Sequence, residues 1–323
     1  MIRALKFSLI LVFAAILSAC GGGKGTGFSF TNSGSGSNSG GTSSSTGSTP
    51  TIQHVVVVVL ENEDYSNVVG SQYMPYWNNL ANQTSLATQF YADVHPSLGN
   101  YLIMTAGVDP TLGSRDPDNW SGTISSDNIA SVLTAGGKTW KAYAQSLPSA
   151  GYTGGDQYPY VKHHNPFVYF ESVLNDSTQT ANIVNLSQFP ADVSGGLPSY
   201  SFIIPDDEHN GHDCPNGGQL CALSDRLTAA DNFLKDNIDP LLQNGSVMAN
   251  TVVIITFDES ATDATNGGGH IPVIVAGGPI KSGYQSTTTY QFQSLLRFSL
   301  SSLGPNNFPG LSSVAVDMNE FLK

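Results

Sequence analysis

Ser97 lies in a short segment flanked by Pro96 and Gly99, and an apolar run that ends at Gly107 follows it directly. The pattern predicts a tight turn and then a helix over residues 100–106, with Ser97 close to the helix N-terminus. Backbone N–H groups at a helix N-terminus lack partners, and the helix dipole favours an incoming anion there. A hydroxyl in that place is suited to attack a phosphoryl group. The structural alternative is that Ser97 only caps the helix.

Acidic and histidine residues gather where several apolar runs end. The runs that we expect to be strands are followed by Glu61 to Asp64, by Asp206 to Asp213 and by Asp258-Glu259, while His270 precedes another run. Carboxylates together with a serine oxygen suit a hard divalent cation, and histidine suits zinc-like ions. A metal beside Ser97 would lower the pKa of its hydroxyl and neutralise phosphate charge. We therefore predict a divalent metal ion as cofactor: calcium, magnesium, manganese or zinc.

Each of these residues also has an ordinary structural interpretation. Glu61 could cap a following helix, Asp206-Asp207 could form a turn, and His270 could be a satisfied loop residue. Three strand ends that carry carboxylates in one chain favour a metal site over three separate explanations. His163-His164-Asn165 is a further cluster. It could bind phosphate or supply a general acid, or it could be a surface turn, and both interpretations stay open at this point.

The elements that must position these residues alternate along the chain. Apolar β-branched runs predict strands over residues 53–60, 139–144, 199–204, 251–257 and 271–276. Helical spacing and caps predict helices over residues 74–80, 100–106, 127–137, 224–242, 290–303 and 316–322. This alternation predicts an α/β fold: a three-layer sandwich with a mostly parallel central sheet and helices on both faces. Ligands of such sheets bind beyond the carboxyl ends of the strands, where the polar residues gather.

The first fifty residues differ from the rest of the chain. Positive charges precede an apolar stretch over residues 7–17, and small residues then lead to Cys20. Residues 1–19 are typical of a bacterial lipoprotein signal that is cut before Cys20, which then carries the lipid. Ordinary cleavage nearby, with Cys20 lost, is the alternative. Residues 20–50 are rich in Gly and Ser, which predicts a flexible tether, and residues 51–323 are enough for one large domain. We expect an exported protein, lipid-anchored to a bacterial cell membrane on its periplasmic or cell-surface side.

Charge and cysteine content narrow the possibilities. The 323 residues include 25 Asp and Glu against 12 Lys and Arg, a net charge of −13, which argues against nucleic-acid binding by a basic surface. Because export leads to an oxidising compartment, Cys214 and Cys221 are predicted to pair and close a short loop. A two-cysteine metal site is the competing interpretation, but the sequence has no second pair of cysteines to complete it.

Taken together, the motifs resemble a bacterial phosphoesterase family that includes acid phosphatases and phosphatidylcholine-type phospholipases C, within the alkaline phosphatase superfamily. The likeness covers most of residues 53–303. It rests on the following segments in this order: Val59-Leu-Glu61-Asn62, His95-Pro-Ser97-Leu-Gly-Asn100-Tyr, Lys141-Ala-Tyr143, His164-Asn-Pro-Phe167, Asn210-Gly-His212-Asp213, Thr256-Phe-Asp258-Glu259-Ser260, His270-Ile-Pro-Val and Ser294-Leu-Leu-Arg297. Each segment is a weak pattern, and their number and order make the match specific.

The resemblance implies roles for individual residues. Ser97 is the nucleophile, and Asn100 donates a hydrogen bond to a phosphoryl oxygen. His164 and His212 complete the implied catalytic residues. The resemblance further implies metal ligation by Glu61, Asn62, Asp258, Glu259 and His270, and substrate binding by His95, His163 and Asn165. This sequence departs from the family pattern at Asn210, where relatives carry Asp, so that a second metal position depends on Asp206, Asp207 or His209 for the missing charge.

The resulting expectation is metal-dependent hydrolysis of phosphate monoesters through a phosphoseryl intermediate on Ser97. The chain has no long extra region that would grip a lipid headgroup. A phospholipase C-type phosphodiesterase is the alternative enzyme, for which Tyr65, Tyr73, Trp77 and Trp120 could form a choline-binding aromatic cage. A surface-binding lipoprotein that has lost the chemistry is a third possibility, and the intact Ser97 argues against it.

Overall fold

The computed structural model describes residues 51–323. The predicted signal segment (1–19), the predicted lipidation site Cys20 and the predicted tether (20–50) lie outside the described residues. Within the described part of the chain, no helix combines the length and the apolar character that crossing a membrane requires.

One eight-stranded sheet forms the centre of the described region, in the order β4-β3-β5-β1-β6-β7-β2-β8. The strands are β1 His54–Leu60, β2 Ser85–Tyr91, β3 Trp140–Ala144, β4 Ile183–Asn185, β5 Tyr200–Ile204, β6 Thr251–Phe257, β7 His270–Gly277 and β8 Tyr284–Ser286. All pairings are parallel except those of β7, which is antiparallel to both β6 and β2. Every side chain from Val55 to Leu60 is fully buried, as expected for a central strand covered on both faces.

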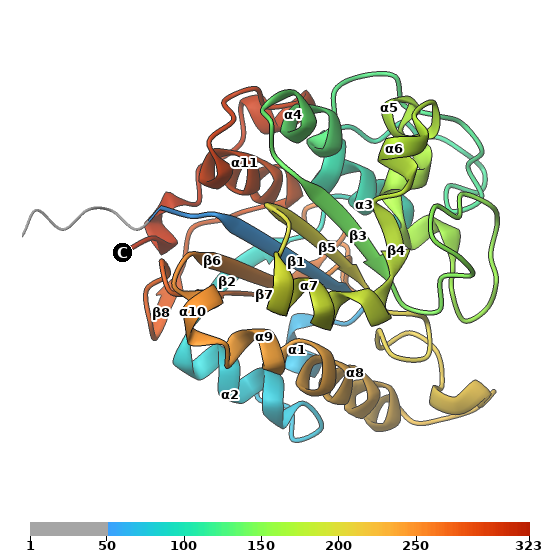
Figure 1. Ribbon diagram of the computed structural model, residues 1–323. Coiled ribbons are helices and arrows are strands. Elements are labelled where there is room, and N and C mark those ends of the chain that lie inside the picture. Colours follow the sequence, from blue (N-terminus) through green and yellow to red (C-terminus); the bar gives the residue numbers. More distant parts are fainter. Residues whose placement is uncertain (1–50) are drawn as a thin grey trace, which may run out of the picture. The chain divides into compact units, whose positions relative to one another are not determined.

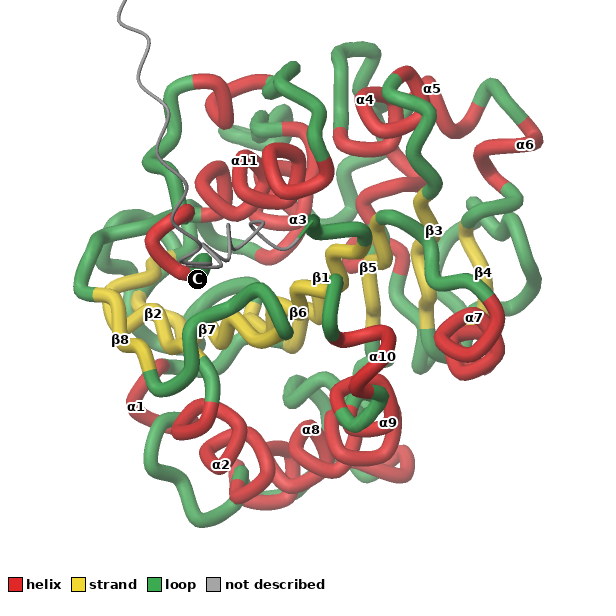
Figure 2. Tube along the Cα trace, turned by 60° about the vertical axis from the view of Figure 1, so that its left-hand side comes forward, coloured by secondary structure: helices red, strands yellow, loops and turns green. Residues whose placement is uncertain are grey.

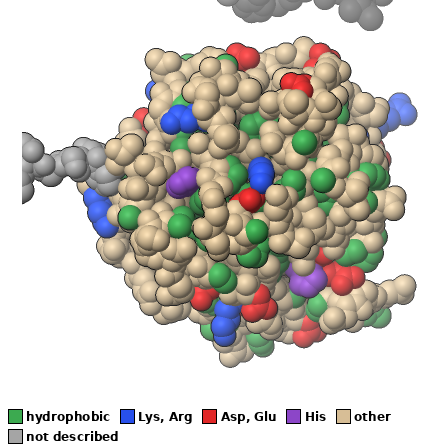
Figure 3. All heavy atoms as spheres, in the orientation of Figure 1, with side chains coloured by type: hydrophobic (Ala, Val, Ile, Leu, Met, Phe, Trp, Pro, Cys, Tyr) green, Lys and Arg blue, Asp and Glu red, His purple; other side chains and the backbone are tan. Residues whose placement is uncertain are grey.

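Helices cover both faces of the sheet, which confirms the predicted three-layer architecture. The helices are α1 Tyr65–Val68, α2 Pro75–Gln83, α3 Ser97–Ala106, α4 Ile129–Ala135, α5 Glu171–Leu174, α6 Ser177–Thr180, α7 Phe189–Gly195, α8 Leu223–Asn237, α9 Asp239–Leu242, α10 Gly245–Met248 and α11 Phe292–Leu303. Figures 1 and 2 show α3, α4 and α11 on one face and α2, α8 and α9 on the other. Figure 3 shows acidic and basic side chains scattered thinly over one side of the molecule, in keeping with a sequence that is only 11% charged.

The five predicted strands all form, and the differences lie elsewhere. Strand β2 was not predicted because its sequence, Ser-Leu-Ala-Thr-Gln-Phe-Tyr, lacks both a solid apolar run and strict alternation. The three-residue strands β4 and β8 are too short to leave a periodic signal. The predicted helix over residues 224–242 is divided into α8 and α9 at Ile238, because Pro240 cannot continue a helical hydrogen-bond ladder. Only a single 3₁₀ turn, Asn319–Phe321, forms within the predicted helix 316–322.

Because β7 runs opposite to β1, β5 and β6, the polar segments that flank these strands all lie at one edge of the sheet. Parallel strands β1, β5 and β6 end at this edge, and the residues that follow them are Glu61, Pro205 and Asp258. Strand β7 runs the other way, so that its first residue, His270, lies at the same edge. This edge is where ligands bind in open α/β sheets.

Glu320 holds the C-terminal segment to the opposite region of the sheet. Its carboxylate accepts hydrogen bonds from the hydroxyls of Tyr290 (2.6 Å), Tyr284 (2.9 Å) and Ser286. Burial alone would raise the pKa of Glu320, but hydrogen bonds from Ser286, Tyr290 and Tyr284 outweigh it and lower the pKa to about 2. The ionised carboxylate is therefore the form that the fold favours.

The low pKa of Glu320 makes a prediction about stability against pH. A depressed pKa in the folded state means that the stabilisation is complete above the unfolded value of 4.5 and is lost as the pH falls toward about 2. We expect Glu320→Gln to lower the free energy of unfolding by about 1 kcal/mol at pH 7, the usual scale for losing hydrogen bonds to a charged group that is partly exposed. Denaturant unfolding at pH 7 and near pH 2 checks this, since the gap between variant and wild type should close at the lower pH. A gap that is constant across pH would contradict it.

Candidate active site

Ser97 is the first residue of α3, so the helix begins three residues before the predicted range of 100–106, and Ser97 lies at the helix N-terminus where the sequence predicted it to be close. The N-cap position belongs to Pro96, whose side chain makes no capping hydrogen bond. The Ser97 hydroxyl lies 3.3 Å from Glu259 Oε1 and 3.4 Å from Glu61 Oε2, and the residue is only 5% exposed. Its oxygen therefore faces carboxylates instead of closing the end of its own helix, which the capping alternative would require.

The carboxylates beside Ser97 come from the ends of two neighbouring strands. Glu61 follows β1, and Asp258-Glu259 follows β6. Oxygen Oδ1 of Asp258 accepts hydrogen bonds from the backbone N–H groups of Asn62 (3.0 Å) and Glu259 (2.8 Å), while its Oδ2 is buried without a partner. Burial, and then the charges of Glu61 and Glu259, raise the pKa of Asp258 well above its usual value. A set of buried carboxylate oxygens with an unpaired member fits a hard divalent cation, which would supply the missing positive charge.

His164 joins this group from the other side. Its Nε2 lies 2.8 Å from Glu61 Oε1 and its Nδ1 lies 3.3 Å from Asp207 Oδ1, while the ring of Tyr101 on α3 stacks on it at 5.3 Å. Burial would lower the pKa of His164, but the charge of Glu61 and the contact with Asp207 raise it to about 10. The same pairing lowers the pKa of Glu61 in spite of its burial. An imidazolium is thus held between two carboxylates.

His95 reaches the carboxylates through Glu259. Its Nδ1 lies 2.7 Å from Glu259 Oε2, and its Nε2 lies 3.0 Å from the carbonyl oxygen of Asp263. The hydrogen bond with Glu259 is the largest influence on the pKa of His95 and raises it. The observed contacts make His95 a residue that orients Glu259 beside Ser97. The sequence had predicted a substrate-binding role.

Asn100 and Asn165 make other contacts than those expected. The side chain of Asn100 is fully buried: its Oδ1 accepts from the backbone N–H groups of Asp93 and Val94, and its Nδ2 donates to the Val94 carbonyl at 2.8 Å. Asn100 thus holds the turn before Ser97, where the sequence predicted a hydrogen bond to phosphate. Asn165 is also fully buried, and its Nδ2 lies 3.3 Å from the Tyr160 hydroxyl.

The remaining predicted histidines lie in different surroundings. The ring of His163 packs edge-on against His164 at 4.3 Å, and burial lowers its pKa. The ring of His270 stacks on Tyr65 at 4.1 Å and on Tyr91 at 4.9 Å, and its Nε2 lies 3.0 Å from the Thr88 carbonyl oxygen. Among the described residues, no hydrogen bond or ion pair joins His270 to the carboxylates beside Ser97, so the aromatic stack accounts for its position.

The loop after β5 supplies a second group of polar atoms. The departure from the family pattern, Asn210, is turned inward: it accepts from the His212 N–H at 2.8 Å and donates to Asp207 Oδ1 at 3.0 Å. Ligand atoms of Asp207, His212 and Asp213 lie within 4.8 Å of one another, a grouping that could hold a cation. Asp207 is thus the neighbouring carboxylate that can supply the charge absent from Asn210.

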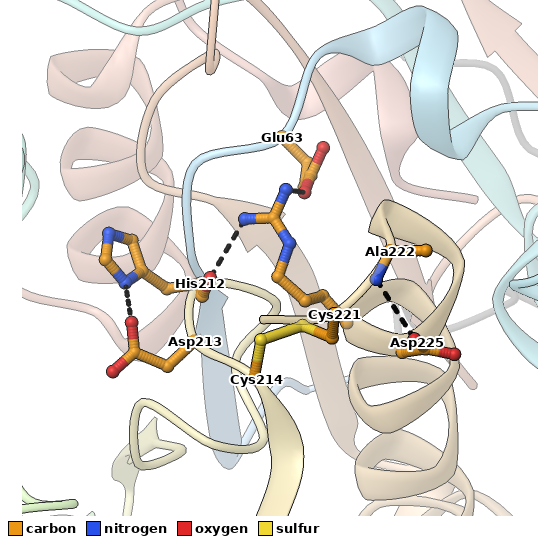
Figure 4. The surroundings of a disulfide bond; sticks show 8 residues. Glu63, His212, Asp213, Cys214, Cys221, Ala222 and Asp225 are labelled. Atoms are coloured by element: carbon orange, nitrogen blue, oxygen red, sulfur yellow. Dashed lines mark hydrogen bonds and ion pairs between the residues drawn. A yellow bond between two sulfur atoms is a disulfide. The ribbon is translucent and has the colours of Figure 1, made fainter. Parts of the chain in front are cut away.

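Arg226, in the first turn of α8, connects the two loops that carry the site. Its Nη1 donates to the His212 carbonyl at 2.9 Å, and its Nη2 lies 3.6 Å from Glu63, which is fully buried two residues after Glu61. The loops also meet directly, since the Glu61 N–H donates to the Asn210 carbonyl at 2.9 Å. Cys214 and Cys221 form the predicted disulfide, which links the His212 loop to the start of α8. Figure 4 shows Glu63, His212 and the disulfide gathered there.

This bridge makes Arg226 a positioning residue for His212 and Glu61. We expect Arg226→Met to lower turnover of the substrate by about tenfold or more, because small displacements of reacting groups have effects of this size. The variant should also be less stable by about 1 kcal/mol, since Glu63 loses Arg226 but keeps its hydrogen bond from Asn67. Arg226→Lys keeps the charge but loses the guanidinium that contacts two partners at once. Its turnover and stability should therefore lie between those of wild type and Arg226→Met. Lys235→Met on the exposed side of the same helix is the matched control, and equal activity of both methionine variants would refute the assignment.

Sequence reasoning missed several contributors to the site. Asp118 accepts from the Leu98 N–H at 3.0 Å at the start of α3, yet it comes from an aperiodic loop rich in Asp, Pro and Ser that gives no positional signal. Tyr101 was assigned only to a helix, although its place one turn after Ser97 puts it on the same side of α3. Arg226 could have been noticed as one of few basic residues, five positions after Cys221.

Comparisons with known proteins agree with this geometry. Residues 71–301 match the Phosphoesterase family. The chain belongs to the Phosphoesterase family. A phosphatidylinositol-3-phosphatase of Mycobacterium tuberculosis is 30% identical over 247 residues, which are 76% of this chain and 75% of that protein. A probable acid phosphatase of Kluyveromyces lactis is 34% identical over 64% of this chain and 47% of its own length, and an acid phosphatase of Aspergillus fumigatus is 31% identical over 74% and 52%. The phosphoesterase chain therefore spans about half the length of these two fungal relatives.

Solved structures place the fold of this phosphoesterase. A protein of the alkaline phosphatase superfamily from Vibrio parahaemolyticus superposes with a TM-score of 0.58 at 17% identity, over 80% of this chain and 67% of the other. The PsFucS1 sulfatase from Pseudoalteromonas gives a TM-score of 0.55 at 12% identity, over 84% and 74%. The resemblance to this superfamily that the motifs indicate is thus matched by the fold.

Proposed function

We propose that this chain hydrolyses phosphate monoesters with a divalent metal ion and through a phosphoseryl intermediate on Ser97. The observation that carries the proposal is the position of the Ser97 hydroxyl at the start of α3, within 3.4 Å of the carboxylates of Glu61 and Glu259. The family membership and the printed names of the relatives, acid phosphatase and phosphatidylinositol-3-phosphatase, support phosphoester hydrolysis as the reaction class.

The metal would be held by Glu61, Asp258 and Glu259, with Asn62 next to them. A bound divalent ion lowers the pKa of a serine hydroxyl and neutralises charge on the phosphoryl oxygens. Without a bound cation, burial first and the neighbouring charge of Glu61 second raise the pKa values of Asp258 and Glu259. His270 is not needed in this arrangement, because its ring is held in the stack with Tyr65 and Tyr91.

Side chains of the protein carry out the bond-making and proton-transfer steps. Ser97 Oγ attacks phosphorus and gives its proton to Glu259, and the bond from phosphorus to the alcohol oxygen breaks. His212, whose exposed ring is held by Asp213 through Nδ1 at 2.7 Å, would protonate the departing alcohol. His164, as a cation between Glu61 and Asp207, keeps Glu61 ionised and oriented. Water then attacks phosphorus and gives a proton back to His212, the bond from phosphorus to Ser97 Oγ breaks as Ser97 regains its proton from Glu259, and inorganic phosphate leaves.

The phospholipase alternative depended on a choline-binding cage of four aromatic residues that the sequence suggested. Trp77 is fully buried in the core, Tyr65 is stacked on His270, and Trp120 is stacked on Tyr169 at 5.8 Å. With three of the four aromatic residues committed to these packing contacts, they do not provide a free choline-binding cage. A panel of phosphomonoesters, phosphodiesters and phospholipids, assayed with and without chelator, tests the proposal, and exclusive cleavage of diesters would overturn it.

We propose in addition that the protein is exported and lipid-anchored through Cys20, on the strength of the N-terminal sequence. Cys20→Ala should release the protein from the membrane fraction and leave the activity of residues 51–323 unchanged, since the folded region does not include Cys20. Mass spectrometry of the mature N-terminus is the direct measurement. An unmodified N-terminus on soluble, exported protein would refute the anchor.

A further inference from the structure

A groove of about 580 Å³ lies beside the site, and its lining includes Tyr158, His212, Leu220, Arg226 and the Cys214–Cys221 disulfide. None of these residues except His212 has a part in the proposed reaction at the phosphorus atom. His212 belongs to both places, because its loop is bonded to Glu61 through the Asn210 carbonyl. The groove therefore adjoins the side chain that serves the departing alcohol in the proposed reaction.

Two large apolar side chains are exposed at this groove, whose lining is otherwise mostly polar. Leu220 is 97% exposed and Tyr158 is 56% exposed, and both belong to a short list of large hydrophobic side chains on the surface of the described region. Leu220 immediately precedes Cys221, so that the disulfide fixes the base of the loop that carries it. A leucine held in water on a covalently closed loop has an energetic cost that contact with an apolar ligand would remove.

The charge around the groove is negative. Burial and the neighbouring carboxylates of Asp213, Glu208 and Asp207 raise the pKa of Tyr158 to about 12. The positive group of the lining, Arg226, is already committed to Glu63 and the His212 carbonyl. As long as no cation occupies the grouping of Asp207, His212 and Asp213, a ligand part that carries a second phosphate would meet repulsion there, whereas an uncharged apolar part would not.

We propose that this groove binds the alcohol part of the substrate and selects phosphate monoesters whose alcohol is apolar and carries no further negative charge. The proposal rests on the proposed function, since it assigns the substrate class of the same site. Leu220 and Tyr158 act as specificity residues that contact the alcohol and leave the phosphoryl chemistry to the buried group around Ser97.

The test compares ligands that share the phosphoryl group and differ in the rest. Ethyl phosphate and hexyl phosphate have alcohols of similar acidity, and hexane-1,6-diyl bisphosphate adds a second charge at the same length. We expect kcat/KM for hexyl phosphate to exceed that for ethyl phosphate by about tenfold, a part of what four fully buried methylene groups would contribute. The bisphosphate should be about tenfold poorer than hexyl phosphate.

Variants of the groove residues then test whether the preference for hexyl phosphate over ethyl phosphate depends on the groove. Leu220→Ser, alone and combined with Tyr158→Ser, should bring the hexyl-to-ethyl ratio to within about threefold of unity and leave kcat/KM for ethyl phosphate within twofold of wild type. Val314→Ser replaces an equally conspicuous surface residue, 82% exposed and outside the groove, and should leave the ratio unchanged. A wild-type ratio near one, or a ratio that survives both groove variants, would overturn the proposal.

A binding measurement separates this proposal from the proposed function. Calorimetric titration of the wild-type protein with hexylphosphonate and ethylphosphonate, which are not hydrolysed, reports the groove without any turnover. Tighter binding of hexylphosphonate that Leu220→Ser removes would support the groove even if no ester were hydrolysed. Equal binding of the two phosphonates, together with normal hydrolysis of ethyl phosphate, would refute the groove and leave the proposed function intact.

Discussion

Replacing Ser97 with alanine should abolish nearly all hydrolysis of phosphate monoesters, with a loss on the order of 10³-fold or more. The reason is that no other hydroxyl replaces the one that lies between Glu61 and Glu259 at the start of α3. The folded structure should survive, because the change removes one oxygen and the turn before α3 is held by Asn100. Steady-state rates with a monoester, together with thermal unfolding of both proteins, measure the two effects.

The matched control is Ser299→Ala on α11. Ser299 is likewise a buried helical serine, and its hydroxyl has no hydrogen-bond partner in the described region. Acid quench during turnover should trap a phosphorylated peptide spanning Asp93 to Gly107 in the wild type. If Ser97→Ala kept more than roughly a tenth of wild-type turnover, the loss would be under about 1.4 kcal/mol and Ser97 would not be the nucleophile.

Removing either of the buried acids Asp258 and Glu61 should remove metal and activity together. We expect Asp258→Asn and Glu61→Gln to lower both the bound metal and turnover by about 100-fold or more, which corresponds to about 3 kcal/mol of transition-state stabilisation. Elemental analysis of the purified proteins, and the rate as a function of added metal, are the measurements. Dialysis against a chelator should inactivate the wild type, and added divalent ion should restore it.

Glu171→Gln is the control for a lost carboxylate, because Glu171 bonds to Thr123 near the start of α5 and takes no part in the group beside Ser97. Full activity of the wild type after exhaustive chelation, with no metal detected, would remove the metal from the proposal. Without a metal, Asp258→Asn is expected to stabilise the fold, because it relieves the repulsion between Asp258 and its neighbours Glu61 and Glu259. The sign of this stability change therefore distinguishes a metal site from a cluster of protonated acids.

The central part of the fold could be predicted from sequence because it depends on local pattern. The unbroken apolar run of β1 can be covered only in the middle of a sheet, and the turn before Ser97 predicts the start of a helix. The edge strand β8 and the irregular strand β2 could not be found in this way, since their pairing with other strands, and not their own sequence, makes them strands. The antiparallel direction of β7 likewise depends on how the chain connects β6 to β7, and the residues of β7 do not indicate it.

The candidate site was predictable in its residue types and less so in its contacts. Strand ends placed Glu61 and Asp258 together, because parallel strands deliver their last residues to one edge. Asn100 has the spacing of a phosphate donor, and its side chain also bonds to the backbone of Asp93 and Val94, contacts that depend on the three-dimensional path of the turn. His270 is at the predicted edge, but its ring stacks on the rings of Tyr65 and Tyr91.

The direction of β1 has a consequence for how the protein can be handled and how it meets its substrate. The strand leads from residue 54 to Glu61, about 23 Å at the usual rise per residue, so the mouth of the site and the start of the described chain lie at opposite poles. Thr51 and Lys323 line one hollow at the far pole, so both ends of this region emerge there. A fusion partner or a bead attached directly at either end of residues 51–323 would therefore lie away from the mouth of the site.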